Sequence, residues 1–253
     1  MTEQPKKTLD VVVDGNIFPE FADVSLDYNP IHRDREVAKI HGFDDTPTQG
    51  VLLQAYFEKC ALINNMPVDV SSLTFKNPAY PGNKLHFSFE NSDVTPGFYC
   101  RNQDGKLIAQ LIPKPREPFV VDESRKIAIY ENSLFWQDAE KFKQLVGFRE
   151  VDESVGYFPR TLVSSLVPAS LLRFVSDLGG SLTGVYRRIG STFWAKPQQG
   201  KYTTNIYFKK AHKRGNIYDF EYSCSNDEQG RVSSGDIRVI AEKKLALEEQ
   251  AAA

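Results

Sequence analysis

An internal repeat constrains the fold of this chain more than any other feature. Residues 71–87 (SSLTFKNPAYPGNKLHF) resemble residues 190–208 (GSTFWAKPQQGKYTTNIYF), since both contain an aromatic residue, a proline, a glycine turn and an alternating strand. Residues 98–112 and 221–241 each contain two strand-like stretches around a polar turn that ends in glycine. That pattern predicts a β-hairpin in each half. We therefore expect two similar structural units in one chain.

An apolar segment with helical character precedes each set of strands. Residues 50–65 place apolar side chains at helical spacing, and residues 160–180 are apolar over most of their length. Pro168 lies inside the second segment and is expected to kink or split that helix, because proline cannot donate a backbone hydrogen bond. A Gly-Phe pair precedes each segment, at Gly42-Phe43 and at Gly147-Phe148.

This order of elements predicts an α+β fold made of two tandem units. A long apolar helix is buried on most sides when an antiparallel sheet curls around it. One such unit leaves a sheet edge unpaired, and two units remove that edge by joining into one sheet. We expect an N-terminal unit at residues 1–115, a linker at 116–126, a C-terminal unit at 127–245 and a tail at 246–253. The prolines and charged residues of the linker favour this boundary.

Composition is typical of a soluble globular protein. The 253 residues are 41% hydrophobic and 25% charged with a net charge of −2, which gives no global reason to bind nucleic acid or an anionic membrane. No stretch is apolar enough to span a membrane, and the N-terminal residues do not resemble a secretory signal. Cys60, Cys100 and Cys224 are expected to be buried free thiols, which favours a cytoplasmic location. We expect no metal site and no cofactor.

Residues 25–34 (SLDYNPIHRD) contain the most specific motif of the sequence. Asp27 and His32 are five residues apart, so an uninterrupted helix would not place them on one face. Asn29-Pro30 favours a turn, which can direct both side chains toward one point. A carboxylate and an imidazole that meet at one water molecule can divide proton transfers between them. The alternative interpretation is an ordinary polar surface turn.

Residues 21–57 resemble the hydratase motif of MaoC-like (R)-specific enoyl-CoA hydratases and 3-hydroxyacyl-thioester dehydratases, which have the hot-dog fold. The residues that match the family pattern are Ser25, Asp27, Asn29, Pro30, His32, Asp34, Ala38, Gly42, Phe43 and Gly50. Two positions depart from it, because Gln49 stands in place of the usual histidine and Leu26 replaces a common glycine. Asp34 is expected to cap a helix at residues 35–40 rather than to act in catalysis.

The resemblance implies a tandem hot-dog fold, an acyl-CoA or acyl carrier protein thioester as substrate, and a role for each motif residue. Asp27 and His32 are implied to be the catalytic pair, with Asn29 orienting the loop or the water. The Gly50 N–H is implied to receive the thioester oxygen, because an unpaired N–H at a helix N-terminus stabilises negative charge. Ser25 and Gln49 are supporting residues. Gln49 either keeps the hydrogen bond of the family histidine or marks a different substrate preference.

The second half lacks the motif, since residues 120–160 contain no histidine. This half is expected to complete the sheet and to shape an acyl tunnel. Its candidates for contact with the phosphates of coenzyme A or with an acidic carrier protein are Arg187, Arg188, Lys209, Lys210, Lys213 and Arg214. For the cations around His212, a solvated run of charge is the simpler interpretation.

The expected activity is reversible hydration of trans-2-enoyl thioesters to (R)-3-hydroxyacyl thioesters. Two alternatives remain open, an acyl-CoA thioesterase on the same fold and a non-catalytic acyl-binding or structural protein. Gln49 is the feature that favours the non-catalytic alternative. The molecule is expected to be a monomeric double hot-dog or a homodimer.

Overall fold

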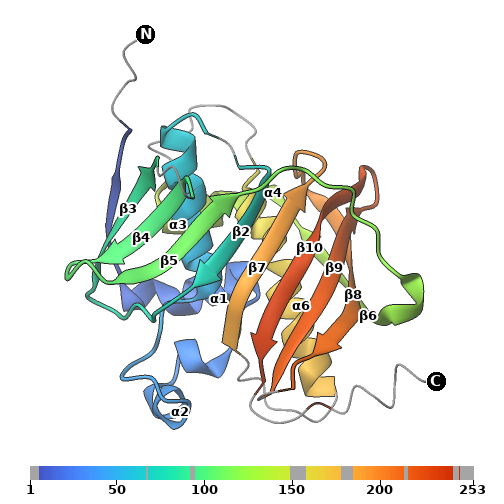
Figure 1. The fold of residues 1–253 in the computed structure, drawn as a ribbon, viewed down its shortest axis with the longest axis horizontal. Helices are drawn as coiled ribbons and strands as arrows, with labels where there is room; N and C mark the ends of the chain where they lie inside the picture. Colours follow the sequence, from blue (N-terminus) through green and yellow to red (C-terminus); the bar gives the residue numbers. More distant parts are fainter. Residues whose placement is uncertain are drawn as a thin grey trace.

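The computed structural model describes residues 6–66, 68–91, 95–148, 158–177, 185–213, 216–241 and 245. Within them, one antiparallel sheet crosses the molecule, and helices α3 and α6 lie behind it in the view of Figure 1. Its strands are β1 (Leu9–Val12), β2 (Val70–Phe75), β3 (Lys84–Glu90), β4 (Gly97–Asn102), β5 (Leu107–Pro113), β6 (Lys126–Leu134), β7 (Val185–Phe193), β8 (Gly200–Ala211), β9 (Ile217–Asn226) and β10 (Gly230–Ile240). The predicted tail at 246–253 and Arg214 lie outside the described residues.

The two halves of the chain contribute their strands in the same order. The first half runs β1-β3-β4-β5-β2, and the second runs β6-β8-β9-β10-β7 from the opposite edge. They meet where residues 70–74 of β2 pair with residues 188–192 of β7. The edge that each unit alone would expose is therefore covered by the other unit. This arrangement confirms the two tandem units predicted from the repeat, joined as in the double hot-dog fold that the resemblance implied.

Each half has a long central helix on the inner face of the sheet. In the first half it is α3 (Gly50–Ile63), which is buried over most of its length because apolar residues occupy most of its surface. In the second half it is split into α5 (Arg160–Ser164) and α6 (Leu166–Asp177). Pro168 explains the split, since it removes the N–H that would bond to the Ser164 carbonyl. Pro168 itself lies in the first turn of α6, where no such N–H is needed.

Shorter helices complete each unit. They are α1 (Phe18–Ser25), α2 (Arg35–Ile40) and α4 (Trp136–Val146), with 3-10 turns η1 (Gly15–Ile17), η2 (Pro30–His32) and η3 (Glu123–Arg125). Gly42 and Gly147 follow α2 and α4 with φ of 80° and 74°, a left-handed conformation that favours glycine. The repeated Gly-Phe pairs therefore end a short helix in both halves.

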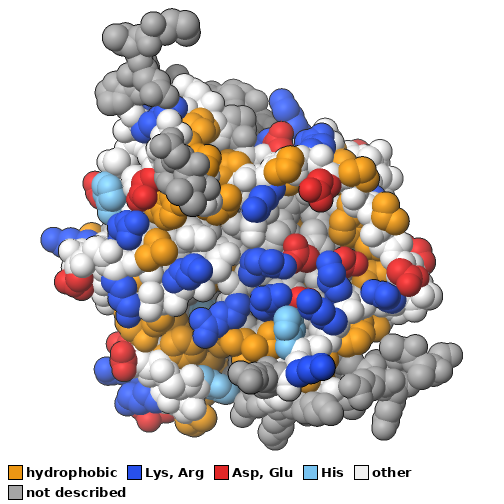
Figure 2. All heavy atoms as spheres, viewed as in Figure 1, with side chains coloured by type: hydrophobic (Ala, Val, Ile, Leu, Met, Phe, Trp, Pro, Cys, Tyr) orange, Lys and Arg blue, Asp and Glu red, His pale blue; other side chains and the backbone are white. Residues whose placement is uncertain are grey.

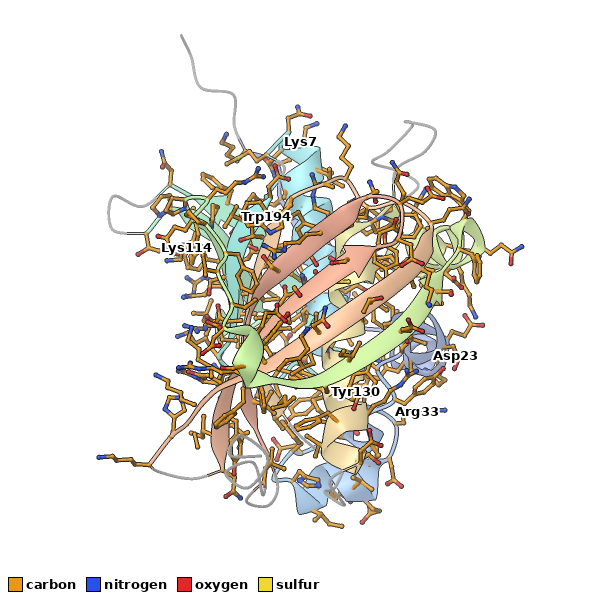
Figure 3. All side chains as sticks on the ribbon, turned by 90° about the vertical axis from the view of Figure 1, so that its right-hand side faces the viewer. Lys7, Asp23, Arg33, Lys114, Tyr130 and Trp194 are labelled. Carbon is orange, nitrogen blue, oxygen red and sulfur yellow. The ribbon has the colours of Figure 1, made fainter. Side chains whose placement is uncertain are left out.

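The helices and the sheet enclose a core that both halves share. Phe21 of α1 packs against Phe142 of α4 with ring centroids 5.5 Å apart, and both belong to the cluster around α3. A second cluster lies between α6 and strands β7–β10. At the far edge, Tyr130 of β6 lies beside α6 and donates from its hydroxyl to Asp177 at 2.9 Å (Figure 3). The sheet thus curves around each central helix, as expected for this fold.

Two other expectations concern the interior and the helices. Cys60, Cys100 and Cys224 are buried and free, as predicted. None of the described helices combines the length and the apolar character that crossing a membrane requires.

Candidate active site

The motif loop begins where α1 ends, at an unusual backbone conformation. Leu26 has φ 59° and ψ 17°, which is left-handed. This conformation costs a residue with a Cβ atom about 1–2 kcal/mol, and glycine adopts it freely. The family pattern commonly has a glycine at this position, where this chain has Leu26. The left-handed backbone explains why glycine is preferred there.

Side chains of the motif hold the loop after Leu26. The N–H of Asp27 donates to Ser25 Oγ and the N–H of Asn29 to Asp27 Oδ1, each at 3.4 Å. The N–H of Ile31 donates to Asn29 Oδ1 at 3.3 Å, which caps η2. Alternate residues thus satisfy the backbone of a segment that has no regular structure of its own. Ser25 and Asn29 therefore support the loop that carries Asp27 and His32.

Asp27 and His32 face each other inside this loop. Asp27 is fully buried and His32 is 6% exposed, and 3.8 Å separates Asp27 Oδ2 from His32 Nε2. His32 Nδ1 donates to the Pro47 carbonyl oxygen at 2.7 Å, which orients the ring with Nε2 toward Asp27. A separation of 3.8 Å is too long for a direct hydrogen bond. Both groups can therefore contact a third polar group.

Burial changes the acid strength of Asp27. Loss of solvent raises the pKa of its carboxyl group above the ordinary value, while the charge of His32 and the Asn29 N–H lower it by less. Its Oδ2 atom receives no hydrogen bond from any described residue. A carboxylate with a raised pKa and a free oxygen is a stronger proton acceptor than a solvated one.

Gly50 is the first residue of α3, and Gln49 is its N-cap. The backbone at Gly50 is not left-handed, and its N–H belongs to the first turn, where no acceptor exists inside the helix. The buried Gln49 donates from Nε2 to the Asp27 carbonyl at 3.4 Å, so it links the start of α3 to the motif loop. Its Oε1 atom receives no hydrogen bond within the described structure.

A cavity of about 430 Å³ opens beside His32 and Gly50, while the fully buried Asp27 is not one of its wall residues. Its wall includes His32 and Gly50 from the first half and Tyr186 and Arg187 from the second. It lies where β2 and β7 separate, since their pairing stops at Thr74 and Arg188. The volume is ordinary for a small-molecule site. The apolar part of the wall includes Ile31, Phe43, Leu53, Phe75 and Val185.

Lys76 and Arg187 are exposed cations on this wall. Neither makes an ion pair with a residue that the structure describes. Arg187 is the extra residue of a bulge in β7, because Tyr186 and Arg188 pair with consecutive residues of β10. A bulge commonly redirects a side chain beside a functional site, as it does here.

The other predicted cations lie away from the cavity, on the outer face of the sheet. Arg188 pairs with Asp236, and Lys209 Nζ lies 2.7 Å from Glu221. Lys210 Nζ lies 3.8 Å from Asp219, which His212 also contacts at 3.1 Å. Figure 2 shows this face, where Lys and Arg form a band across the middle and fewer Asp and Glu lie among them. Within the described structure, the partners of these cations are neighbouring carboxylates.

The helix start in the second half is already occupied. The N–H groups of Arg160 and Thr161, which open α5, donate to the Glu58 carboxylate at 2.8 and 2.9 Å. Glu58 belongs to α3, so one half caps the helix of the other. A substrate oxygen therefore has access to the N-terminus of α3 but not to that of α5. The described residues contain no cluster of His, Cys, Asp and Glu placed to hold a metal ion.

The sequence did not identify Lys76, Phe75 and Tyr186 as residues of the site, although all three line the cavity. Phe75 and Lys76 follow the motif by more than forty positions and belong to the repeated strand region. The repeat indicated that this region forms a strand, but no local signal connected it with Asp27.

The fold and the site together define a double hot-dog protein with a buried aspartate-histidine pair in its first unit. Residues 2–110 match the family model described as the MaoC like domain. The chain therefore carries a MaoC-like dehydratase domain in its first half. Among curated proteins, none matches the sequence significantly.

Several solved structures share the whole fold at low sequence identity. A conserved hypothetical protein from Mycobacterium tuberculosis with a double hot-dog fold is 10% identical with a TM-score of 0.67, over 94% of this chain and 96% of that chain. A putative MaoC domain protein dehydratase from Chloroflexus aurantiacus is 10% identical with a TM-score of 0.64, over 95% and 96% of the chains. The 12:0-ACP thioesterase from Umbellularia californica is 6% identical with a TM-score of 0.59, over 93% and 94%. These likenesses show the fold alone, which hosts more than one activity.

Proposed function

We propose that this protein catalyses the reversible hydration of trans-2-enoyl thioesters to (R)-3-hydroxyacyl thioesters. The observation that carries the proposal is the buried pair of Asp27 and His32, 3.8 Å apart, beside a cavity that the N-terminus of α3 also reaches. The MaoC-like domain match supports the reaction class. The resemblance of the motif to (R)-specific hydratases supports the stereochemistry.

In the hydration direction, the Gly50 N–H donates to the thioester carbonyl oxygen and stabilises the enolate-like charge that forms there. Asp27 accepts a proton from water while the water oxygen bonds to C3. The π electrons move toward C1, and His32, which enters this step as an imidazolium with its other proton on Nδ1 toward the Pro47 carbonyl, donates the Nε2 proton to C2. Proton transfer from Asp27 to His32 then restores the starting state. Dehydration is the reverse of these steps.

Charge at the cavity supports a phosphate-bearing thioester. Lys76 and Arg187 line the wall, are exposed and have no described carboxylate partner. Exposed cations without a carboxylate partner are available to bind the phosphate groups of coenzyme A or of the prosthetic group of an acyl carrier protein. Arg188, Lys209 and Lys210 are not part of this proposal, because each lies beside a carboxylate on the outer face.

The direct test follows crotonyl-CoA by the loss of its enone absorbance, with chiral analysis of the product. We expect wild type to form the (R)-3-hydroxy product and Asp27→Asn to form almost none. Release of free coenzyme A thiol without hydration would instead indicate a thioesterase. Binding of acyl-CoA without turnover of any enoyl thioester would overturn the proposal in favour of a non-catalytic role.

A further inference from the structure

A second, apolar space lies behind one wall of the catalytic cavity. It is about 10 Å³ in volume, close to the smallest space that holds one water molecule. Its wall is formed by side chains of α6 and of the strands facing it, Leu171, Leu172, Val175, Phe220, Val239 and Ala241, together with Tyr186. Tyr186 lines the catalytic cavity as well. Tyr186 therefore belongs to the wall of the catalytic cavity and to the wall of an apolar space inside the second unit.

Tyr186 is held firmly in this position. The residue is 8% exposed, its ring belongs to the apolar cluster of the second half, and its hydroxyl donates to the Pro168 carbonyl at 3.1 Å. Loss of solvent and the nearby negative charge of Asp27 raise its pKa well above the ordinary value. The phenol is therefore neutral at physiological pH.

The order of groups along the cavity sets the direction of the acyl chain. If the thioester oxygen lies at the Gly50 N–H, then C1 lies beside the start of α3 and C3 beside Asp27 and His32. Carbons beyond C3 then extend away from Gly50 along the cavity, whose wall includes Tyr186.

We propose that Tyr186 forms the end of the acyl site and restricts this protein to short-chain enoyl thioesters. The inference rests on the proposed function and names the substrate class of the same site. The apolar space behind the ring marks the direction in which a longer acyl chain would extend. Removal of the ring would join the two spaces into one apolar tunnel along α6, because the other side chains that surround the space are all apolar.

The test compares kcat/KM for trans-2-enoyl-CoA substrates of four, eight and twelve carbons. We expect wild type to prefer the four-carbon substrate and Tyr186→Ala to raise the ratio of eight-carbon to four-carbon kcat/KM by about tenfold or more. Burial of two further methylenes at about 0.8 kcal/mol each corresponds to a factor of this order. Tyr186→Phe keeps the ring and loses only the hydroxyl, so its ranking of the substrates should match wild type. Val175→Phe in the Tyr186→Ala background should refill the space and restore the short-chain preference.

Two results would overturn the inference. One is a wild-type enzyme that hydrates the twelve-carbon substrate as well as the four-carbon one. The other is a Tyr186→Ala protein, shown to be folded by a cooperative melting transition, whose ranking is unchanged. If Tyr186→Ala does not fold, Tyr186→Leu opens part of the same space and must shift the ranking in the same direction.

Failure of the proposed function has a different signature, because wild type would then hydrate no enoyl thioester of any length. Calorimetric binding of saturated acyl-CoA of the same lengths tests the inference in that case. Short-chain binding by wild type and extended-chain binding by Tyr186→Ala would still support Tyr186 as the end of the acyl site. An equal chain-length profile for the two proteins would overturn it.

Discussion

The Glu58 carboxylate accepts hydrogen bonds at 2.8 and 2.9 Å from the first two N–H groups of the helix that begins at Arg160. Glu58 lies on the central helix of the first half, so this contact joins the two units across the interface. It also places a carboxylate at the positive end of the helix dipole of the second half. The starts of the two helices therefore differ, because the start of α5 binds the Glu58 carboxylate of the other half and the start of α3 faces a cavity.

This contact predicts a specific effect on stability. Glu58→Gln keeps the size of the side chain but removes the charge and half of its acceptor capacity, so the free energy of unfolding should fall by about 1–2 kcal/mol. Urea unfolding measures the change. Glu36→Gln is the matched control, because Glu36 forms an exposed helix pair with Lys39 at 2.8 Å and should cost about 0.5 kcal/mol or less. An equal effect of the two variants would contradict the capping role of Glu58.

The catalytic pair predicts non-additive losses of activity. Asp27→Asn retains the shape of the side chain but removes the proton acceptor, so turnover of crotonyl-CoA should fall by about 10²–10⁴-fold. His32→Ala should cause a similar loss, and the double variant should lose little more, because the two groups act on the same proton transfers. Steady-state kinetics on all three variants checks this. Near-normal turnover in either single variant would remove that residue from the catalytic role.

Asp27 also predicts a trade-off between activity and stability. Its folded-state pKa is raised, so between the ordinary value of 3.8 and the raised value the folded protein binds more protons than the unfolded one. Stability contributed at this site therefore falls as pH rises through that window, and the loss is complete above the raised pKa. Asp27→Asn avoids this cost and should melt at a higher temperature than wild type at pH 7.

The difference in melting temperature should shrink as pH is lowered toward 3.8, where wild-type Asp27 becomes protonated in both states. Thermal melts of wild type and Asp27→Asn from pH 4 to pH 8 measure it. Asp34→Asn is the control, because Asp34 caps α2 at an exposed position and asparagine caps equally well. A pH-independent difference for Asp27→Asn would show that desolvation of the carboxylate is not its cause.

The elements that the sequence predicted correctly are those set by neighbouring residues. The helix at 50–63, the hairpin around Gly105 and the Asp34 cap of α2 each depend on periodicity or turn chemistry within a few positions. The Asp27 and His32 motif belongs to the same kind, since its loop is held by hydrogen bonds between alternate residues. Such local patterns are visible in a single sequence.

The parts of the site that the sequence did not reveal depend on long-range pairing. Tyr186 and Lys76 reach the cavity only because β2 and β7 pair and then separate. Arg187 and Arg188 are adjacent in the sequence, and a bulge in β7 decides which of them lines the cavity. No residue pattern near either arginine indicates the bulge, because it arises from the register with β10. The register of β7 with β10 therefore determines which of the two arginines lines the cavity.

The shared sheet and core predict that the first unit needs the second. A fragment of residues 1–115 would expose the edge of β2 that now pairs with β7. It would also lose the contact of Phe21 with the Phe142 ring. We expect this fragment to aggregate, to dimerise through the exposed edge or to remain unfolded. Analytical ultracentrifugation with thermal melting checks this. A monomeric fragment with a cooperative transition would contradict the mutual dependence of the two units.

The start of α3 gives the last prediction. Gly50→Ala should leave the melting temperature nearly unchanged, because the backbone at Gly50 is not left-handed and alanine suits the first turn of a helix. The added Cβ would lie 3.0 Å from the tip of the Phe75 ring, which lines the cavity and can move. If the Gly50 N–H receives the thioester oxygen, kcat and kcat/KM should fall together, by on the order of 10².

A second variant separates substrate crowding from the contact with Phe75. Phe75→Leu in the Gly50→Ala background removes the close approach of the ring but leaves the methyl group beside the substrate oxygen. We expect activity to remain low in the double variant, relative to Phe75→Leu alone. Recovery of activity would assign the loss to displacement of Phe75. A Gly50→Ala protein that is destabilised but fully active would show that Gly50 serves the fold and not the reaction.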